Sequence, residues 1–190
     1  MPTPDVSAHL AALYASAEDP WNTHASPYEQ GKFAQTAASL PRARYRCGLE
    51  VGCGAGALTA HLAPRCDHLI AMDCTADALV TARARTIFPH VDFIQGAAPA
   101  DWPAQRLDVV ILSEVLYFLS DDENAGLAVR IKEDCAPDCD IILVNWLGDT
   151  GGAIKGAAAA DRLTARLADR CQTITSQALD GFRIDVLRQG

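Results

Sequence analysis

Residues 49–58 read Leu49-Glu50-Val51-Gly52-Cys53-Gly54-Ala55-Gly56-Ala57-Leu58. An apolar, strand-like run ends here in three glycines at alternate positions, and a helical pattern follows at once. Glycine allows a tight turn and a close approach of the backbone to a ligand, because no Cβ stands in the way. The first turn of the following helix presents free N–H groups and the positive end of its dipole. The junction therefore predicts a binding site for a nucleotide-like small molecule.

Two classes of cofactor use such a junction. Dinucleotide-binding folds carry the pattern G-x-G-x-x-G/A, which Gly52, Gly54 and Ala57 satisfy loosely. Methyltransferases that use S-adenosylmethionine (AdoMet) carry an acidic residue, one spacer and then alternate glycines. The run from Glu50 to Gly56 resembles that second pattern at every position. The glycine loop alone leaves both cofactors open.

The composition is that of an acidic globular chain. Its 190 residues, 49% of them hydrophobic and 21% charged, suit one α/β domain over residues 1–190. The net charge of −8 and the dispersed arginines argue against a nucleic acid or an anionic membrane surface as partner. The chain shows neither a membrane-spanning apolar run nor a signal-peptide pattern, so we expect a cytoplasmic protein.

The seven cysteines are an odd number with irregular spacing. We interpret them as reduced thiols, and we expect no metal site because neither paired spacing nor nearby histidines fit one. Cys53, within the glycine loop, is expected to be a small filler rather than a nucleophile.

Strand and helix patterns alternate from Cys47 onward, which predicts a mostly parallel sheet with helices on both faces. The expected parallel strands cover residues 48–51, 68–72, 91–94, 107–112 and 140–144. Extended runs at 172–178 and 182–186 flank Asp180-Gly181, which is typical of an antiparallel hairpin. Between them we expect a helix with Leu58 and Leu62 on one face, one capped by Thr75, one that begins at the capping box of residues 120–123, and one over 157–171. Residues 1–46 look helical and irregular, and we expect them to form a lid segment outside the 47–190 core.

Ligands of open parallel sheets bind at the carboxyl ends of the strands. Asp73 ends the second strand seventeen positions after Gly56, where a carboxylate can accept both ribose hydroxyls of an adenosine. Helix capping is its alternative role. Cys74 adjoins it, and Ala97, after the third strand, is expected to offer a main-chain contact to the adenine.

Ser113 and Glu114 follow the buried fourth strand, and Tyr117 comes one turn later. Ser113 and Glu114 are expected to contact the cofactor. Glu114 could also attract a cationic substrate or take a proton, and the alternative is a solvated loop acid. Tyr117 is expected beside it in the catalytic site, and His24 of the lid segment is a second candidate base.

A sulfonium cofactor favours an aromatic face nearby by about 0.5–2 kcal/mol. Trp21, Tyr28, Tyr117 and Trp146 are candidates, with core packing as the alternative for each. Asn145, Trp146 and Asp149 follow the fifth strand and could contact the substrate. Tyr28 and Lys32 have the Y-x-x-x-K spacing of short-chain dehydrogenases, but they precede the glycine loop, so we interpret that match as a coincidence.

These motifs together resemble the class I AdoMet-dependent methyltransferases. A closer resemblance is to the nodulation protein S (NodS) family, and it extends to the N-terminal segment and ends near Trp146. The motifs that carry it are Asp19-Pro20-Trp21, Ser26-Pro27-Tyr28-Glu29-Gln30, the glycine loop, Leu62-Ala63-Pro64 and Ser113-Glu114-Val115-Leu116-Tyr117. The resemblance implies a Rossmann-like α/β fold, with a seven-stranded mostly parallel sheet and a C-terminal antiparallel hairpin. It also implies N-methylation of the free amine of a partly deacetylated chitin oligosaccharide, with AdoMet as methyl donor and S-adenosylhomocysteine as product.

Three other functions stay open from the sequence. One is O-methylation of a small metabolite, and another is AdoMet binding without catalysis. The third is a nicotinamide-dependent oxidoreductase, against which the closing hairpin and the absence of a substrate domain argue.

Overall fold

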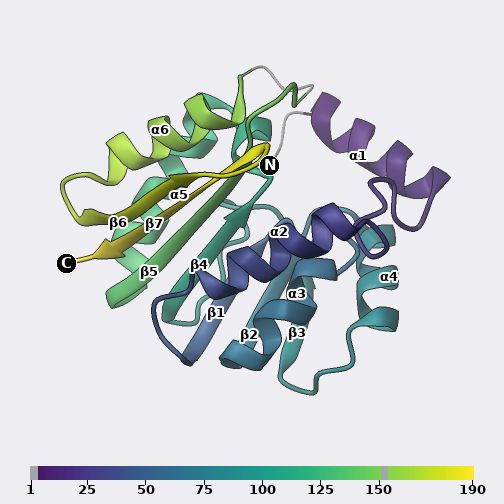
Figure 1. The fold of residues 1–190 in the computed structure, drawn as a ribbon, viewed down its shortest axis with the longest axis horizontal. Coiled ribbons are helices and arrows are strands. Elements are labelled where there is room, and N and C mark those ends of the chain that lie inside the picture. Colours follow the sequence, from purple (N-terminus) through teal and green to yellow (C-terminus); the bar gives the residue numbers. More distant parts are fainter. Residues whose placement is uncertain (1–3, 151–153) are drawn as a thin grey trace.

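The computed structural model describes residues 4–150 and 154–190, whose strands form one sheet of order β3-β2-β1-β4-β5-β7-β6 (Figure 1). Strands β1 to β5 pair in parallel, whereas β7 is antiparallel to both β5 and β6. The strands are β1 (Tyr45–Val51), β2 (Cys66–Asp73), β3 (Val91–Gln95), β4 (Leu107–Ser113), β5 (Cys135–Trp146), β6 (Cys171–Ala178) and β7 (Phe182–Gln189). The predicted seven-stranded sheet with a C-terminal antiparallel hairpin is therefore confirmed.

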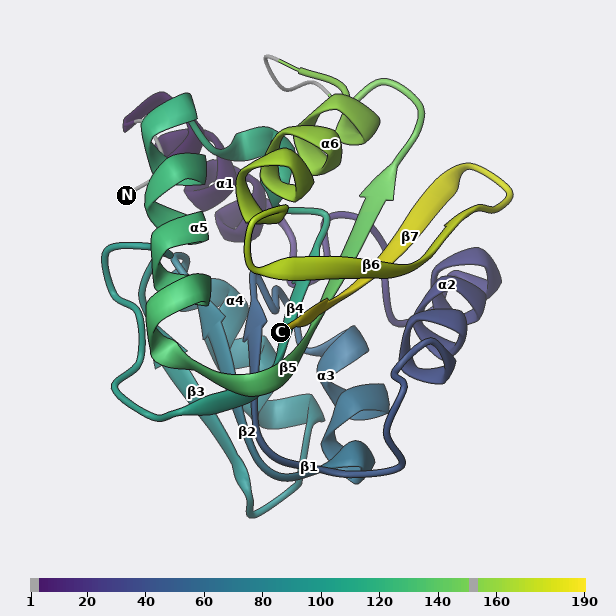
Figure 2. The ribbon, with the colours of Figure 1, turned by 90° about the vertical axis from the view of Figure 1, so that its left-hand side faces the viewer.

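Helices cover both faces of the sheet (Figure 2). One face packs against α2, α3 and α4, and the other packs against α5 and α6. The helices are α1 (Pro4–Ser16), α2 (Pro27–Ala38), α3 (Ala57–Leu62), α4 (Ala76–Arg85), α5 (Asp121–Asp134) and α6 (Gly156–Leu167), with short 3-10 turns η1 (Ala63–Arg65) and η2 (Leu116–Phe118). Helix α1 lies outside both layers and contacts α4 (Figure 1).

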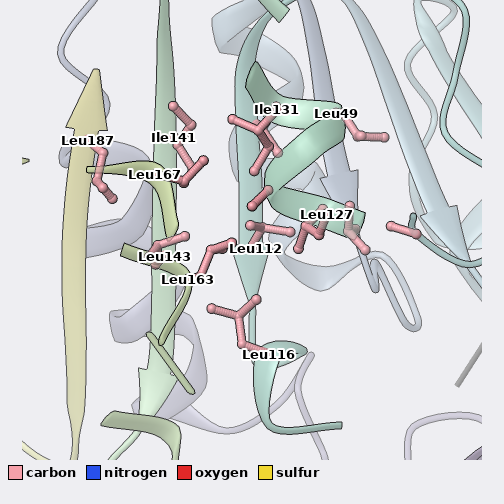
Figure 3. Close-up of a cluster of buried hydrophobic side chains, with 14 of the residues drawn as sticks. Leu49, Leu112, Leu116, Leu127, Ile131, Ile141, Leu143, Leu163, Leu167 and Leu187 are labelled. Atoms are coloured by element: carbon pink, nitrogen blue, oxygen red, sulfur yellow. The ribbon is translucent and has the colours of Figure 1, made fainter. Parts of the chain in front are cut away.

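The centre of the sheet is buried on both sides, because successive side chains of a strand point to opposite faces. In β4, Val110 and Leu112 belong to the cluster beneath α5 and α6, whereas Val109 and Ile111 belong to the cluster beneath α2 and α3. Figure 3 shows the first cluster, in which Leu112 lies among side chains of α5, α6 and the neighbouring strands. This two-sided burial explains the nearly continuous apolar run of β4 and makes the strand a rigid base for the residues that follow it.

Several predicted boundaries were wrong by a few residues. Strand β5 begins at Cys135 rather than residue 140. The prediction started too late because Pro137 and Asp138, whose φ is 61°, interrupt the apolar pattern of the strand. Helix α6 ends at Leu167 rather than residue 171, since Cys171 already pairs in β6. Strand β1 begins at Tyr45, so the sheet starts inside the segment that we expected to be the lid.

The two predicted helix caps differ in outcome. The capping box at Ser120 and Glu123 is present, with both reciprocal hydrogen bonds. Thr75 does occupy the N-cap position of α4, but its side chain makes no capping hydrogen bond there. Within the described residues, no helix combines the length and the apolar character that crossing a bilayer requires.

Candidate active site

A cavity of about 530 Å³ opens at the carboxyl ends of the central strands, between them and the N-terminal helices α1 and α2. All but one of the residues predicted to bind the cofactor line this cavity, and so does Tyr117. The lining residues among them are Trp21, Tyr28, Glu50, Gly52, Cys53, Gly54, Asp73, Cys74, Ala97, Ser113 and Glu114. Segments more than 100 residues apart in the chain thus meet at one site, as the strand-end rule predicts.

The glycine loop has the backbone that its sequence predicts. Gly52, Gly54 and Gly56 have φ values of 75°, 54° and 84°, which L-residues with a Cβ rarely adopt. A Cβ on Gly52 would lie 2.2 Å from Cγ1 of Val115. Gly56 is the N-cap of α3 and packs against Ala82 of α4, which explains why it is the predicted loop residue that does not line the cavity.

Asp73 connects the end of β2 to the glycine loop. Its Oδ2 accepts the N–H of Gly54 at 2.9 Å, and its Oδ1 accepts the N–H of Thr75 at 2.8 Å. Burial raises the pKa of the Asp73 carboxyl, while these N–H groups act in the opposite direction. Each carboxylate oxygen has two lone pairs, so both oxygens can accept a further hydrogen bond.

Glu50, the acidic residue before the glycines, is almost fully buried at 1% exposed. Its Oε2 accepts a hydrogen bond of 2.6 Å from Oγ1 of Thr59 in α3. Burial raises the pKa of Glu50 to about 8, because a carboxylate without solvent is costly to charge. The carboxyl therefore connects β1 to α3 directly beneath the loop.

Glu114 is a hub that connects four parts of the fold. Its Oε1 accepts Nζ of Lys32 at 3.1 Å, and its Oε2 accepts the hydroxyl of Tyr117 and the N–H of Trp146, both at 2.9 Å. The backbone at Glu114 has a φ of 58°, and its own N–H donates to the carbonyl of Val144. The alternative of a freely solvated loop acid is therefore wrong.

Burial, and after it the charge of Glu114, raise the pKa of the Tyr117 phenol. Tyr117 therefore stays a hydrogen-bond donor to Glu114 over the neutral pH range. Cys53 is also buried, and burial raises the pKa of its thiol well above the ordinary range. A thiol in that state is a poor nucleophile, in agreement with the filler role that we predicted.

Lys32 and Glu29 also line the cavity, although neither was predicted as a site residue. Nζ of Lys32 lies 2.9 Å from Oε2 of Glu29, and the Lys32 side chain is only 5% exposed. Burial opposes the charge of Lys32, but the carboxylates of Glu114 and Glu29 outweigh that effect and raise its pKa. The spacing of Tyr28 and Lys32 could have indicated that both residues face the same site, because residues four apart share one face of a helix.

The aromatic candidates divide between two walls of the cavity. Trp21, which is 48% exposed, packs edge-to-face with Tyr14 at a centroid distance of 5.5 Å. Tyr28 packs edge-to-face with Trp146 at 6.0 Å, and its hydroxyl donates to the carbonyl of Asp180. The first pair lies on the side of the glycine loop and the second on the side of Glu114.

His24 is the predicted catalytic residue that does not join the others. Its Nε2 lies 2.9 Å from the carbonyl oxygen of Ala55, and it is not one of the residues that line the cavity. Its backbone N–H donates to Oδ2 of Asp19, which also accepts from Thr23 through its other oxygen. These contacts give His24 a place in the turn before α2, next to the glycine loop. Asn145, a substrate-contact candidate, is fully buried and likewise does not line the cavity, whereas Trp146 and Asp149 do.

Comparison with known proteins places these features in a family. The family model described as nodulation protein S (NodS) matches residues 3–145. The chain belongs to the NodS family. Nodulation protein S of Sinorhizobium fredii (strain NBRC 101917 / NGR234) is 36% identical over 152 residues, which cover 79% of this chain and 65% of that protein. Nodulation protein S of Bradyrhizobium diazoefficiens is 32% identical over 139 residues, which cover 72% and 66%.

Solved structures agree with this NodS-family assignment. A provisionally assigned methyltransferase from Pseudomonas syringae is 31% identical with a TM-score of 0.74, over 85% of this chain and 99% of that one. N-methyltransferase NodS from Bradyrhizobium japonicum WM9, in complex with S-adenosyl-L-homocysteine, is 21% identical with a TM-score of 0.80, over 96% and 98%. The fold is that of the class I methyltransferases. The curated NodS relatives are longer, and the matched segment spans only about half to two thirds of their length.

Proposed function

We propose that this chain is an AdoMet-dependent methyltransferase. The proposed acceptor is an amine of a small molecule, such as an amino sugar of a partly deacetylated chitin oligosaccharide. The observation that carries the proposal is one cavity with two chemically different halves. The glycine loop and Asp73 form one half, and Glu29, Glu114 and Tyr28 form the other.

The first half fits AdoMet. The loop backbone at Gly52 to Gly54 is open toward the cavity, and the carboxylate of Asp73 retains lone pairs for ribose hydroxyls. The backbone around Ala97 borders the same half and is the proposed adenine contact. Helix α1 and Trp21 cover the site, so residues 1–46 would act in part as the lid. When bound there, AdoMet would supply the methyl group that is attached to its positively charged sulfur.

The second half fits a cationic acceptor with an apolar face. Two carboxylates, Glu29 and Glu114, line it, and both lie against the ammonium of Lys32. Tyr28 and Trp146 provide aromatic surface beside them, which suits the apolar face of a sugar ring. NodS-family membership and the name N-methyltransferase on a solved NodS structure support an amine as acceptor.

The acceptor amine must lose a proton before it can attack a methyl group. Glu114 already accepts three hydrogen bonds, so it retains about one of its four lone-pair sites for the acceptor. This suits Glu114 to orient an N–H of the acceptor, and the proton that the amine loses passes to Glu114 or to water. Alignment of the acceptor nitrogen with the methyl group in this cavity would supply much of the acceleration that such reactions need.

The first test is calorimetric titration of the purified chain with AdoMet, S-adenosylhomocysteine and NADH. We expect binding of the first two and none of NADH. The second test incubates the chain with AdoMet and glucosamine oligosaccharides, with fully N-acetylated oligosaccharides as the matched control, and detects methylated product by mass spectrometry. Binding of NADH alone would return the glycine loop to the dinucleotide class. Methylation of the N-acetylated control would instead favour transfer to oxygen.

A further inference from the structure

We propose that Lys32 is a positioning residue that sets which acceptors the cavity admits. Its ammonium orients Glu114 and balances one of two carboxylates, so that the second half of the cavity takes an acceptor with one positive charge. This inference rests on the proposed function, because it concerns the acceptor of that same site.

The contacts of Lys32 stabilise a buried positive charge. Its Nζ lies 2.9 Å from Oε2 of Glu29 and 3.1 Å from Oε1 of Glu114. The same atom lies 5.9 Å from the ring centroid of Tyr28 and 5.8 Å from that of Phe33. A buried ammonium is costly unless it is paired, and here two carboxylates and two aromatic rings surround it.

The charge balance of this site follows from the groups that face Lys32. Helix α2 contributes Glu29 and Tyr28, the end of β4 contributes Glu114, and η2 contributes Tyr117. Both phenols have raised pKa values and are neutral. With Lys32 charged, the two carboxylates and the ammonium sum to one negative charge, which one acceptor ammonium would neutralise. Asp149 lines the same cavity from the segment after β5 and contributes equally to the wild type and to every variant, so this sum counts only the charged groups of the Lys32 ion pairs.

The contact also fixes the direction of Glu114. Its Oε1 accepts a hydrogen bond from Lys32, and its Oε2 accepts hydrogen bonds from Tyr117 and Trp146. Without the ammonium, Oε1 loses its donor and Glu29 and Glu114 become two like charges at one site. Such a pair attracts cations more strongly and makes a bound ammonium hold its proton more tightly.

The experiment compares Lys32→Met, which removes the charge, with Lys32→Arg, which keeps it. The acceptors are glucosamine, which carries one ammonium, and putrescine, which carries two. The readouts are kcat, KM and their pH dependence with AdoMet, together with binding of each amine to the S-adenosylhomocysteine complex. Lys155→Met is the matched control, because Lys155 is exposed, lies at the N-cap of α6 and is not one of the residues that line the cavity.

For Lys32→Met we expect kcat/KM for glucosamine to fall at least 10-fold, and the putrescine-to-glucosamine ratio to rise at least 10-fold. The acidic limb of the pH profile should move to higher pH, because the acceptor is harder to deprotonate. Lys32→Arg should restore the ratio and the profile. AdoMet affinity should change less than 2-fold in all three variants.

Lys32→Met could lose stability through its two uncompensated carboxylates, so a second variant combines it with Glu29→Gln. This double variant again has one net negative charge, and we expect it to regain the preference for glucosamine. An unchanged acceptor ratio and pH profile in Lys32→Met, or a double variant that still prefers putrescine, would overturn the inference.

The two proposals fail in different ways. If the wild-type chain binds amines but methylates none, the proposed function is wrong, and the ratio of binding affinities still decides the role of Lys32. If the wild-type complex binds neither amine, both proposals are overturned.

Discussion

Oδ2 of Asp73 and the backbone nitrogen of Gly54 lie 2.9 Å apart, in a hydrogen bond that joins the end of β2 to the glycine loop. The other carboxylate oxygen accepts the N–H of Thr75 at the start of α4. Asp73 therefore holds the loop in shape in addition to the ribose contact that we propose for it. The two alternative roles weighed for this residue, ribose contact and a contact at the helix start, are compatible.

Replacing Asp73 with alanine should weaken AdoMet binding by about 1–3 kcal/mol, because buried hydrogen-bonding partners lose their acceptor. Calorimetric titration with AdoMet measures the effect. Asp77→Ala, at an exposed position of α4, is the control and should bind AdoMet like the wild type. An unchanged AdoMet affinity in Asp73→Ala would show that Asp73 does not bind the ribose hydroxyls.

Gly52→Ala should impair both stability and AdoMet binding. Its φ of 75° is strained for alanine, at a cost of about 1–3 kcal/mol, and the new Cβ would lie 2.2 Å from Val115. Gly31→Ala is the matched control, because Gly31 lies inside α2 with no atom within 4 Å of the added Cβ. That control should be neutral or stabilising by up to about 1 kcal/mol. Thermal unfolding with and without AdoMet tests both, and equal behaviour of the two variants would contradict the prediction.

Glu50 should make the stability of the chain depend on pH. Its pKa is about 8 in the folded state against 4.5 for the free group, so the folded state binds more protons between these values. The contribution of Glu50 is complete below pH 4.5 and is lost as the pH rises toward 8, at about 1.4 kcal/mol per pH unit at most. Urea unfolding at pH 5 and pH 8.5 measures the loss.

Glu50→Gln removes this titration while an amide oxygen can still accept from Thr59. We expect its unfolding free energy to vary less with pH and to exceed that of the wild type at pH 8.5. Glu133→Gln, at an exposed position of α5, should retain the wild-type pH dependence. Parallel curves for the wild type and Glu50→Gln would show that Glu50 is charged in the folded state.

Glu114→Gln should lower turnover more than it lowers AdoMet affinity. The amide leaves Lys32 with one carboxylate fewer and cannot accept all three donors that now converge on the side chain. Steady-state kinetics with an amine acceptor and calorimetry with AdoMet separate the two effects. Equal losses in both would move Glu114 from the acceptor half of the cavity to the cofactor half.

Local patterns predicted the sheet and the loop, because they depend on residues that are close in the chain. The glycine loop, the buried run of β4 and the turn at Gly181 each have their signal within a few positions. The start of β5 was not predicted, because Pro137 and Asp138 interrupt the apolar pattern and the pairing with β4 shifts register over this part of the strand.

The ion pair between Lys32 and Glu114 was not predicted from the sequence for a different reason. Lys32 and Glu114 are 82 positions apart, and only the docking of α2 against the carboxyl edge brings them together. The family resemblance reached the segment around Tyr28 but attached no chemistry to Lys32. Likewise, nothing near His24 in the chain predicts that its ring meets the carbonyl of Ala55.

Helix α2 contributes residues both to the core and to the cavity. Thr36 is buried in the body of the protein, Tyr28, Glu29 and Lys32 line the cavity, and Phe33 both packs into the core and lines the cavity. Part of the proposed acceptor half, including Glu29 and Lys32, therefore lies in one contiguous stretch, residues 27–38, whereas Glu114 and Trp146 of that half come from the ends of two strands. We expect a graft of this helix between relatives, with Phe33 and Thr36 retained for its packing, to shift acceptor preference while the residues of the glycine loop stay unchanged.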